Sequence, residues 1–314
     1  MGRAKGANLI CSAAFEAAGT PGTVPVSGFY KVPLVSHGLG EEAPLMDEEL
    51  LGLGREPLDP IPDVKTNAGD IVVPVDVRNF GMWLKLFLGA PTTTGTGQRT
   101  HVFASGLLAL PSMSIEMNSP EVTNGATVNY GARGNSFQIG LARSGKLNAS
   151  CNLICIGETD PGASAAGTPT ARAVQRFVQA TGAITKDGSA LGSVVAAELS
   201  FSNQLEAVES IKADGRIEDS DPGMVMLGGK LTVLYKDNTL LAAATSNPPT
   251  PIALTFGWTS GANSLLFSLP RVFLPKPKRP VSGPKGIQAE YVFKASGANA
   301  ASLTATLVND VTGY

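Results

Sequence analysis

The residues of this sequence that could carry chemistry are few and scattered. The 314-residue chain has two histidines, His37 and His101, and neither has a second histidine or a cysteine at the spacing of a metal site. Neither histidine lies beside an obvious nucleophile, and the chain contains no G-x-S-x-G elbow. Metal-dependent and serine-hydrolase chemistry are therefore not expected.

Two acidic motifs could suggest a ligand, and both are better explained as loops. GLGEEA, residues 38–43, fits the G-x-G-x-x-A pattern of dinucleotide-binding turns. Glu41 and Glu42 would stand where a pyrophosphate needs bare amides and positive potential, and no helical pattern follows. The paired acids of LMDEELLG, residues 45–52, could suggest a glycosidase, but aromatic residues, which would stack on a sugar, form only 6% of the chain. We expect no catalytic residue, no cofactor and no metal site.

The cysteines are expected to be buried thiols. Cys151 and Cys155 lie in NASCNLICIGE, which alternates like a strand, so their side chains share a face. At about 3.3 Å per residue their Cα atoms would be roughly 13 Å apart, too far for a disulfide. The odd number of cysteines and the absence of C-x-x-C also favour reduced thiols and synthesis in the cytoplasm.

Composition limits the fold class. Hydrophobic residues make up 43% of the chain and charged residues 16%, which excludes a disordered protein. The 36 glycines and 22 prolines, with few long helical patterns, favour β-structure with many turns. A net charge of −2 gives no general attraction to nucleic acid, and no window reaches the roughly 18 apolar residues that cross a bilayer.

Similar glycine- and proline-containing turn motifs occur twice in the sequence, about half a chain apart. Segments that answer one another in order include GREPLDP (54–60) with GRIEDSDP (215–222), Gly69 with Gly228, and Leu110-Pro111 with Leu269-Pro270. An ordered set of such markers indicates an internal duplication. We therefore predict two domains, residues 1–160 and 161–314.

Each predicted domain contains a hairpin, a long loop, strands and one helix. An Asp-Gly turn at Asp187 predicts a hairpin in the second domain. One apolar stripe, preceded by Asn79 as a cap and ended by Gly89, predicts a helix in the first: Phe80, Trp83, Leu84, Phe87 and Leu88. A shorter stripe after Asn238 predicts its counterpart. The fold class we predict is mainly β (α+β), with two tandem β-sandwich domains, each flanked by one short helix.

Four segments spread over both halves carry a resemblance to a known family. They are VPVDVRNFGMWLKLFLGAPTTT, HVFASGLLALPSMSIEM, VQATGAITKDGSALGSVVAAELSFSNQLEAVESIKADGRIEDSDPG and the terminal LTATLVNDV. Together they resemble the bacteriophage major tail tube proteins. The resemblance implies β-sandwiches that close into rings, and rings that stack into the tube through which DNA leaves. Many members use one domain per subunit in sixfold rings, and this chain departs from them by its duplication.

The resemblance and the duplication together imply the partners. Three chains would supply six pseudo-equivalent domains, so we predict a trimeric ring with approximate sixfold symmetry, stacked into a tube with other tail proteins at its ends. DNA would pass without specific binding, and no membrane is involved. The subunit would be made and assembled in the host bacterial cytoplasm and would end in the virion tail.

Three alternatives for the function remain open. A long non-contractile tail is our prediction, and the inner tube of a contractile tail or a related injection machine is the alternative in the same class. A carbohydrate-binding β-sandwich is the alternative from another class. It would need exposed aromatic platforms, whereas Trp83 and Trp258 look like core residues. An enzyme would need a converging set of acids with perturbed pKa values in one pocket.

Charge indicates how rings would stack. Acids dominate residues 41–65 and 206–221, whereas residues 271–286 carry five basic residues, four prolines and no acid. Opposite potentials would set register between neighbouring rings. The candidate ring-stacking residues are Glu48, Glu49, Arg55, Asp59, Arg216, Asp221, Lys276, Lys278 and Arg279.

Charge also indicates what would line the bore. A basic lining would hold DNA by neutralising phosphates, so an acidic or neutral one is expected. The candidate lumen-facing residues are Asp70, Asp76, Glu198 and Glu206.

Overall fold

Strands are the main regular element of the computed structural model, which describes residues 3–281, 283 and 286–314. One hydrogen-bonded network joins 20 of them, and two short ribbons stand apart from it. Within these residues there are only two α-helices, α1 (Phe80–Leu88) and α2 (Thr239–Thr245), and two 3-10 turns, η1 (Gly6–Asn8) and η2 (Gln179–Thr181). The mainly β class predicted from the turn-rich composition is therefore confirmed.

In the first half of the chain, six strands pair antiparallel in the order β1, β10, β11, β12, β7 and β3. A seventh, β13, pairs with β11. Their bounds are β1 (Ile10–Phe15), β3 (Ser36–His37), β7 (Thr66–Pro74), β10 (Met113–Asn118), β11 (Ala126–Ala142), β12 (Asn148–Ile154) and β13 (Gly157–Glu158). Two further short strands, β2 (Tyr30–Lys31) and β14 (Thr170–Ala171), extend the series beyond β1.

The second half repeats this order of pairing. Its six strands pair antiparallel as β15, β21, β22, β23, β20 and β17, and β24 pairs with β22 as β13 pairs with β11. Their bounds are β15 (Ala183–Lys186), β17 (Val194–Ser202), β20 (Met226–Leu234), β21 (Ile252–Ser260), β22 (Asn263–Phe273), β23 (Gln288–Ala295) and β24 (Thr304–Asn309). The hairpin predicted at Asp187 joins β15 to β16 (Ser189–Ala190).

Register repeats as well as order at one pair of strands. In β3·β7, His37 faces Ile71; in β17·β20, Ala197 faces Leu231, and both residues lie 160 positions after their counterparts. A Cβ on Gly69 would meet the carbonyl oxygen of Gly38, which follows β3, and a Cβ on Gly229 would meet that of Glu198 in β17. Gly229, rather than Gly228, is thus the counterpart of Gly69.

The correspondence shifts after the helices because the first half has an insertion. Cys151 faces Ile71 and Tyr291 faces Leu231, so β12 and β23 lie only 140 positions apart, 20 fewer than β7 and β20. The extra residues hold β8 (Thr92–Thr94) and β9 (Arg99–Ala104). Matching Leu110 with Leu269 is therefore wrong, since Leu110 precedes β10 whereas Leu269 lies in β22.

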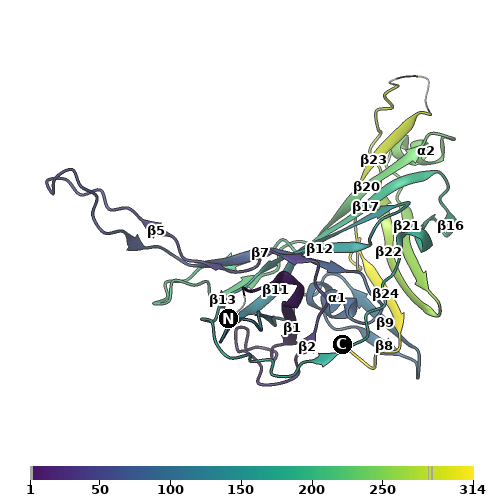
Figure 1. Ribbon diagram of the computed structural model, residues 1–314. Helices are drawn as coiled ribbons and strands as arrows, with labels where there is room; N and C mark the ends of the chain where they lie inside the picture. The colour runs from purple at the N-terminus through teal and green to yellow at the C-terminus, as the bar shows by residue number, and fades with distance from the viewer. Residues whose placement is uncertain (1–2, 282, 284–285) are drawn as a thin grey trace.

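The two series are joined into one curved body. β11 pairs with β17, and β24 pairs with β9 of the insertion. Both pairings therefore join strands of the first half to strands of the second. Figure 1 shows β7, β12, β17, β20 and β23 following one another from the centre of the molecule to its upper right. In the second half, β21 and β22 pack as a second layer, with Phe256 of β21 stacked on Phe293 of β23 at 6.2 Å between ring centroids. One apolar core runs through both halves.

Helix α1 has the predicted bounds but not the predicted side-chain cap. Its apolar stripe is buried, and Gly89 ends it with a positive φ of 90°. Asn79 occupies the N-cap position without a side-chain capping bond. The Asp76 carboxylate instead stabilises the turn that leads into the helix, accepting hydrogen bonds from the amides of Arg78 (3.3 Å) and of the N-cap residue Asn79 (3.1 Å).

Each half has a long connection between two equivalent strands, which we call an excursion. The first, between β3 and β7, contains β4 (Glu41–Glu42), β5 (Leu45–Met46) and β6 (Ile61–Pro62), and projects far from the body as a thin arm at the left of Figure 1. The second, between β17 and β20, is the shorter ribbon of β18 (Glu206–Val208) and β19 (Asp219–Asp221). We call residues 43–64 the arm.

Candidate assembly surfaces

One long sheet runs through both halves in the strand order β3, β7, β12, β11, β17, β20 and β23. It buries one face and exposes the other. Alternation along each strand places small and polar side chains on the exposed face, with Ser150 facing Gln138 and Gln138 facing Ser200 across three strands. The charged residues on this face are Asp70, Glu198, Lys230, Glu290 and Lys294. Three acids and two bases leave the face slightly acidic.

Two of the four candidate lumen acids lie on this face. Asp70 accepts a hydrogen bond from the Asn152 side chain at 2.7 Å, and Glu198 lies 3.6 Å from the Lys230 ammonium group. Glu206 is exposed but lies on the separate β18–β19 ribbon, where it faces Asp221. Both acids of that pair are therefore away from the sheet.

Asp76 is not on any exposed face, and its prediction as a lumen residue is wrong. It is completely buried beneath the start of α1. Burial raises the pKa of its carboxyl above the ordinary value, although hydrogen bonds from Asn79 and Arg78 act in the opposite direction. Its hydrogen bonds hold the turn that leads into α1.

The arm combines acids with unpartnered apolar side chains. Among the candidate stacking residues, Glu49, Arg55 and Asp59 are exposed near its end and Glu48 is half-buried. Large apolar residues are exposed beside them, namely Leu45, Met46, Leu50, Leu51, Leu53, Ile61 and Val64. Leu51 is as accessible as in an extended chain, at 100%. A segment with so much exposed apolar surface is typical of an interface.

The base of the arm is tied to the second excursion. The Arg216 guanidinium donates two hydrogen bonds to Glu41, at 2.5 and 2.8 Å, and Lys65 lies 3.5 Å from the same carboxylate. Partial burial raises the pKa of Glu41, but the bonds from Arg216 and the Glu158 amide outweigh it and leave the pKa below its ordinary value. Arg216 thus has a partner in its own chain, and its role as a candidate ring-stacking residue stays a prediction.

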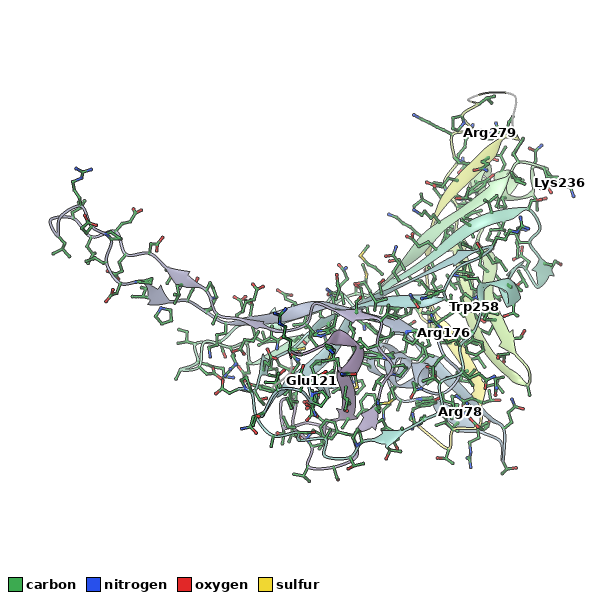
Figure 2. All side chains as sticks on the ribbon, in the orientation of Figure 1. Arg78, Glu121, Arg176, Lys236, Trp258 and Arg279 are labelled. Carbon is green, nitrogen blue, oxygen red and sulfur yellow. The ribbon has the colours of Figure 1, made fainter. Side chains whose placement is uncertain are left out.

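The basic segment, which we define as residues 275–281, lies at the opposite end of the long sheet from the arm. Lys276, Lys278 and Arg279 are exposed, and the Arg279 guanidinium lies 4.8 Å from the centre of the Tyr235 ring. Figure 2 shows Arg279 near Lys236 at the upper right, whereas the arm projects to the left. Ser282, Pro284 and Lys285 of this basic run lie outside the described residues. Within one chain the acidic and basic segments cannot meet.

The residues considered for chemistry have structural surroundings. His101 is buried between Thr93 and Asn309, whereas His37 is exposed in β3. Cys11, Cys151 and Cys155 are buried and free, and burial raises the pKa of Cys11 to about 12. In the described part of the chain, no three His, Cys, Asp or Glu side chains are grouped to hold a metal. No helix found there is long and apolar enough to cross a membrane.

Among the residues that the structure describes, no exposed aromatic side chain offers a platform on which a sugar could stack. Trp83 and Trp258 are buried, as predicted. Among the described residues, none of the exposed large apolar side chains is aromatic. This argues against a carbohydrate-binding surface, which needs exposed rings for the sugar to stack on.

Comparison with known proteins agrees with this geometry. The family model described as "Phage tail tube protein" matches residues 6–295, nearly the whole chain. No curated protein matches the chain.

Proposed function

The chain belongs to the phage tail tube protein family, and from that premise we propose that three copies close into a ring whose stacked layers form a DNA-conducting tube. Membership makes the protein a structural subunit of the virion tail that assembles with itself and with other tail proteins. The steps proposed beyond this are the number of chains in the ring, the lining of the bore and the contacts between rings. We assign the protein no catalytic step.

The trimeric ring is supported by the repeated order of strand pairing. Six pairings of the first half recur in the second, including one register with a constant offset of 160. We infer an internal duplication into domains 1–160 and 161–314, so that three chains supply six similar units. Closing such sheets into a barrel removes their open edges.

The exposed face of the long sheet is the surface we propose to line the bore. Its serines, glutamine and glycine, with Asp70 and Glu198, present no cluster of cations to DNA. Each phosphate neutralised by a lysine or arginine would release counterions and add affinity, so such a face lets a duplex pass. Glu206 and the buried Asp76 are not part of this proposal.

Stacking is proposed to depend on the arm, which reaches away from its own subunit. Glu48, Glu49, Arg55 and Asp59 accompany the exposed leucines there, and Asp221 lies exposed on the neighbouring excursion. We propose that these residues, and the basic Lys276, Lys278 and Arg279, contact neighbouring chains. Heterologous contacts that repeat along an axis build a filament.

A long non-contractile tail is the setting we propose, with the inner tube of a contractile tail or related injection machine as the second candidate. Assembly would take place in the cytoplasm of the host bacterium. The purified chain tests the common part of both candidates, because each requires self-assembly. Negative-stain images should show rings or tubes with a central channel, and a monomer that stays monodisperse at every protein concentration and salt would contradict the proposal.

A further inference from the structure

We propose that residues 275–281 of one chain lie beside residues 36–42 of the next chain in the same ring, and that charge holds this junction in place of strand pairing. The inference rests on the proposed ring. It moves the partner of the basic segment from a neighbouring ring, where the sequence suggests it, to a neighbouring chain within one ring.

The junction inside the chain is the template for this contact. β11 of the first half pairs with β17 of the second through seven residue pairs, from Ser136 with Ser202 to Ala142 with Ala196. If the halves are equivalent units of a ring, the second half should meet the next first half through the same two positions.

The position of β17 is occupied in the first half by residues 36–42. They lie 160 positions before residues 196–202, and β3, which begins this segment, pairs with β7 in the register in which β17 pairs with β20. No described strand pairs with the other edge of β3. Glu41 and Glu42 end the segment, next to the acidic arm.

The position of β11's last residues is occupied in the second half by residues 275–281. Cys151 faces Phe137 in the first half, and the Phe273–Lys294 register of β22·β23, continued by three residues, brings Lys276 opposite Tyr291, the counterpart of Cys151. Val281 thereby corresponds to Ala142. This segment forms no strand, and the edge of β23 beside it is unpaired from Gln288 to Phe293 among the described residues.

Its composition explains why it forms no strand. Pro275, Pro277 and Pro280 lack the amide hydrogens that a ladder requires, while Lys276, Lys278 and Arg279 supply charge. Proline and lysine on an open edge prevent indiscriminate pairing between free subunits. The chemistry that can still select a partner is attraction to acids, which the exposed Glu42 and the acids of the arm provide, since Glu41 is already bonded to Arg216.

The second strand pairing that joins the two halves of one chain, β24 with β9, is also missing between chains. Within the chain, β24 pairs with β9 through six residue pairs, but β9 belongs to the insertion, and the described residues of the second half contain no counterpart of it. The ring would therefore alternate between hydrogen-bonded junctions inside chains and charged junctions between them. Raised salt should separate rings into whole chains, because exposed charges are screened.

Cysteine cross-linking tests the position without removing a charge. Ser36→Cys and Val281→Cys place thiols at the positions equivalent to Ala196 and Ala142, and both native residues are exposed. The three native cysteines are buried and should not react with a short bismaleimide. Chains carrying only Ser36→Cys, mixed with chains carrying only Val281→Cys, should give covalent dimers in assembled rings, and the double variant should give species up to the trimer.

Two matched variants control for geometry. Ala142→Cys with Ala196→Cys should cross-link within one chain, and Leu108→Cys, which is exposed on another loop, should not react with Ser36→Cys. Visible rings without the 36–281 cross-link would overturn the inference and leave the proposed function intact. Failure of unsubstituted chains to form rings at all would instead contradict the proposed function.

Charge reversal tests the chemistry of the junction separately. The triple variant Lys276→Glu, Lys278→Glu and Arg279→Glu should lose rings while keeping the unfolding transition of the parent chain. Low salt should strengthen rings of the parent chain and high salt should dissolve them. Rings that survive both the reversal and high salt would show that charge does not hold this junction.

Discussion

Two glycines at equivalent positions of the sheet leave no room for a side chain. A Cβ on Gly69 would lie 2.3 Å from the carbonyl oxygen of Gly38, and one on Gly229 would lie 1.9 Å from that of Glu198. Each substitution to alanine should therefore force the neighbouring strand away. We expect Gly69→Ala and Gly229→Ala each to lower the free energy of unfolding by about 1–3 kcal/mol, measured by denaturant titration.

Gly140→Ala is the matched control for these glycine variants. Gly140 lies in β11 of the same sheet, and a Cβ there would meet nothing within 4 Å. Its effect should be close to zero. Equal losses at all three positions would mean that strand propensity, and not the close approach of two backbones, sets the cost.

His101 makes the stability of the fold depend on pH. Its Nε2 faces two acceptors, Asn309 Oδ1 and the Val311 carbonyl oxygen, both at 3.1 Å, so Nε2 carries the proton and Nδ1 accepts from Thr93. Burial lowers the pKa of His101 below the ordinary value, in spite of these hydrogen bonds. The unfolded chain therefore binds more protons, and stability is complete above about pH 6.5 and falls as the pH falls below it.

This pH dependence can be measured and assigned. The free energy of unfolding should decrease below about pH 6.5 with a slope of at most about 1.4 kcal/mol per pH unit from this one site. His101→Gln should be less stable but should lose this part of the slope. An unchanged slope in the variant would assign the pH dependence to other groups.

Among the elements, the arm should matter for assembly and not for folding. Its exposed leucines, Leu51 and Leu53, contribute little to the core of the free subunit. We expect Leu51→Ser with Leu53→Ser to change the melting temperature by no more than about 2 °C, because surface substitutions rarely change stability by much. Tube length in electron micrographs should fall sharply.

Val26→Ser is the control for the arm variant. Val26 is about as exposed as Leu51, at 98% against 100%, but lies on a loop between β1 and β2. It should leave both folding and tube length unchanged. Tubes of normal length from the leucine variant would show that the arm faces solvent in the assembly.

The elements also show what could be predicted from the sequence. The stripe of Phe80 to Leu88, with Gly89 after it, predicts α1 to the residue, and the turn at Asp187 predicts the β15–β16 hairpin. These signals are local. The β8–β9 insertion is not local, because only the pairing of β12 with β7 and of β23 with β20 reveals that the halves differ in length.

Site prediction failed where a side chain's partner is distant or unexpected. Asp76 and Asp70 look alike in the sequence, yet one is buried under α1 and the other is exposed on the sheet. The local signal for Asp76 is that an aspartate can accept hydrogen bonds from the backbone amides of the residues that follow it in a turn, here Arg78 and Asn79. The bond from Arg216 to Glu41 spans 175 positions and leaves no such signal.

For the whole molecule, the character of the bore is open to direct test. If the exposed face of the long sheet lines it, assembled tubes should bind duplex DNA weakly. Gln138→Lys adds a cation in the middle of that face in every chain, and it should give tubes that retain DNA in a salt-dependent manner. Tight, salt-sensitive binding by the unsubstituted tubes would contradict a non-retaining bore, and no change on adding the lysine would place this face away from the DNA.

The number of chains in one ring tests the central claim, that two similar units lie in each chain and that six units close a ring. Rings dissociated from tubes can be weighed by native mass spectrometry, and end-on averages give their symmetry independently. We expect about three times the 32.3 kDa mass of the chain, with six similar lobes around the channel. A ring of six whole chains with twelve lobes would contradict the account.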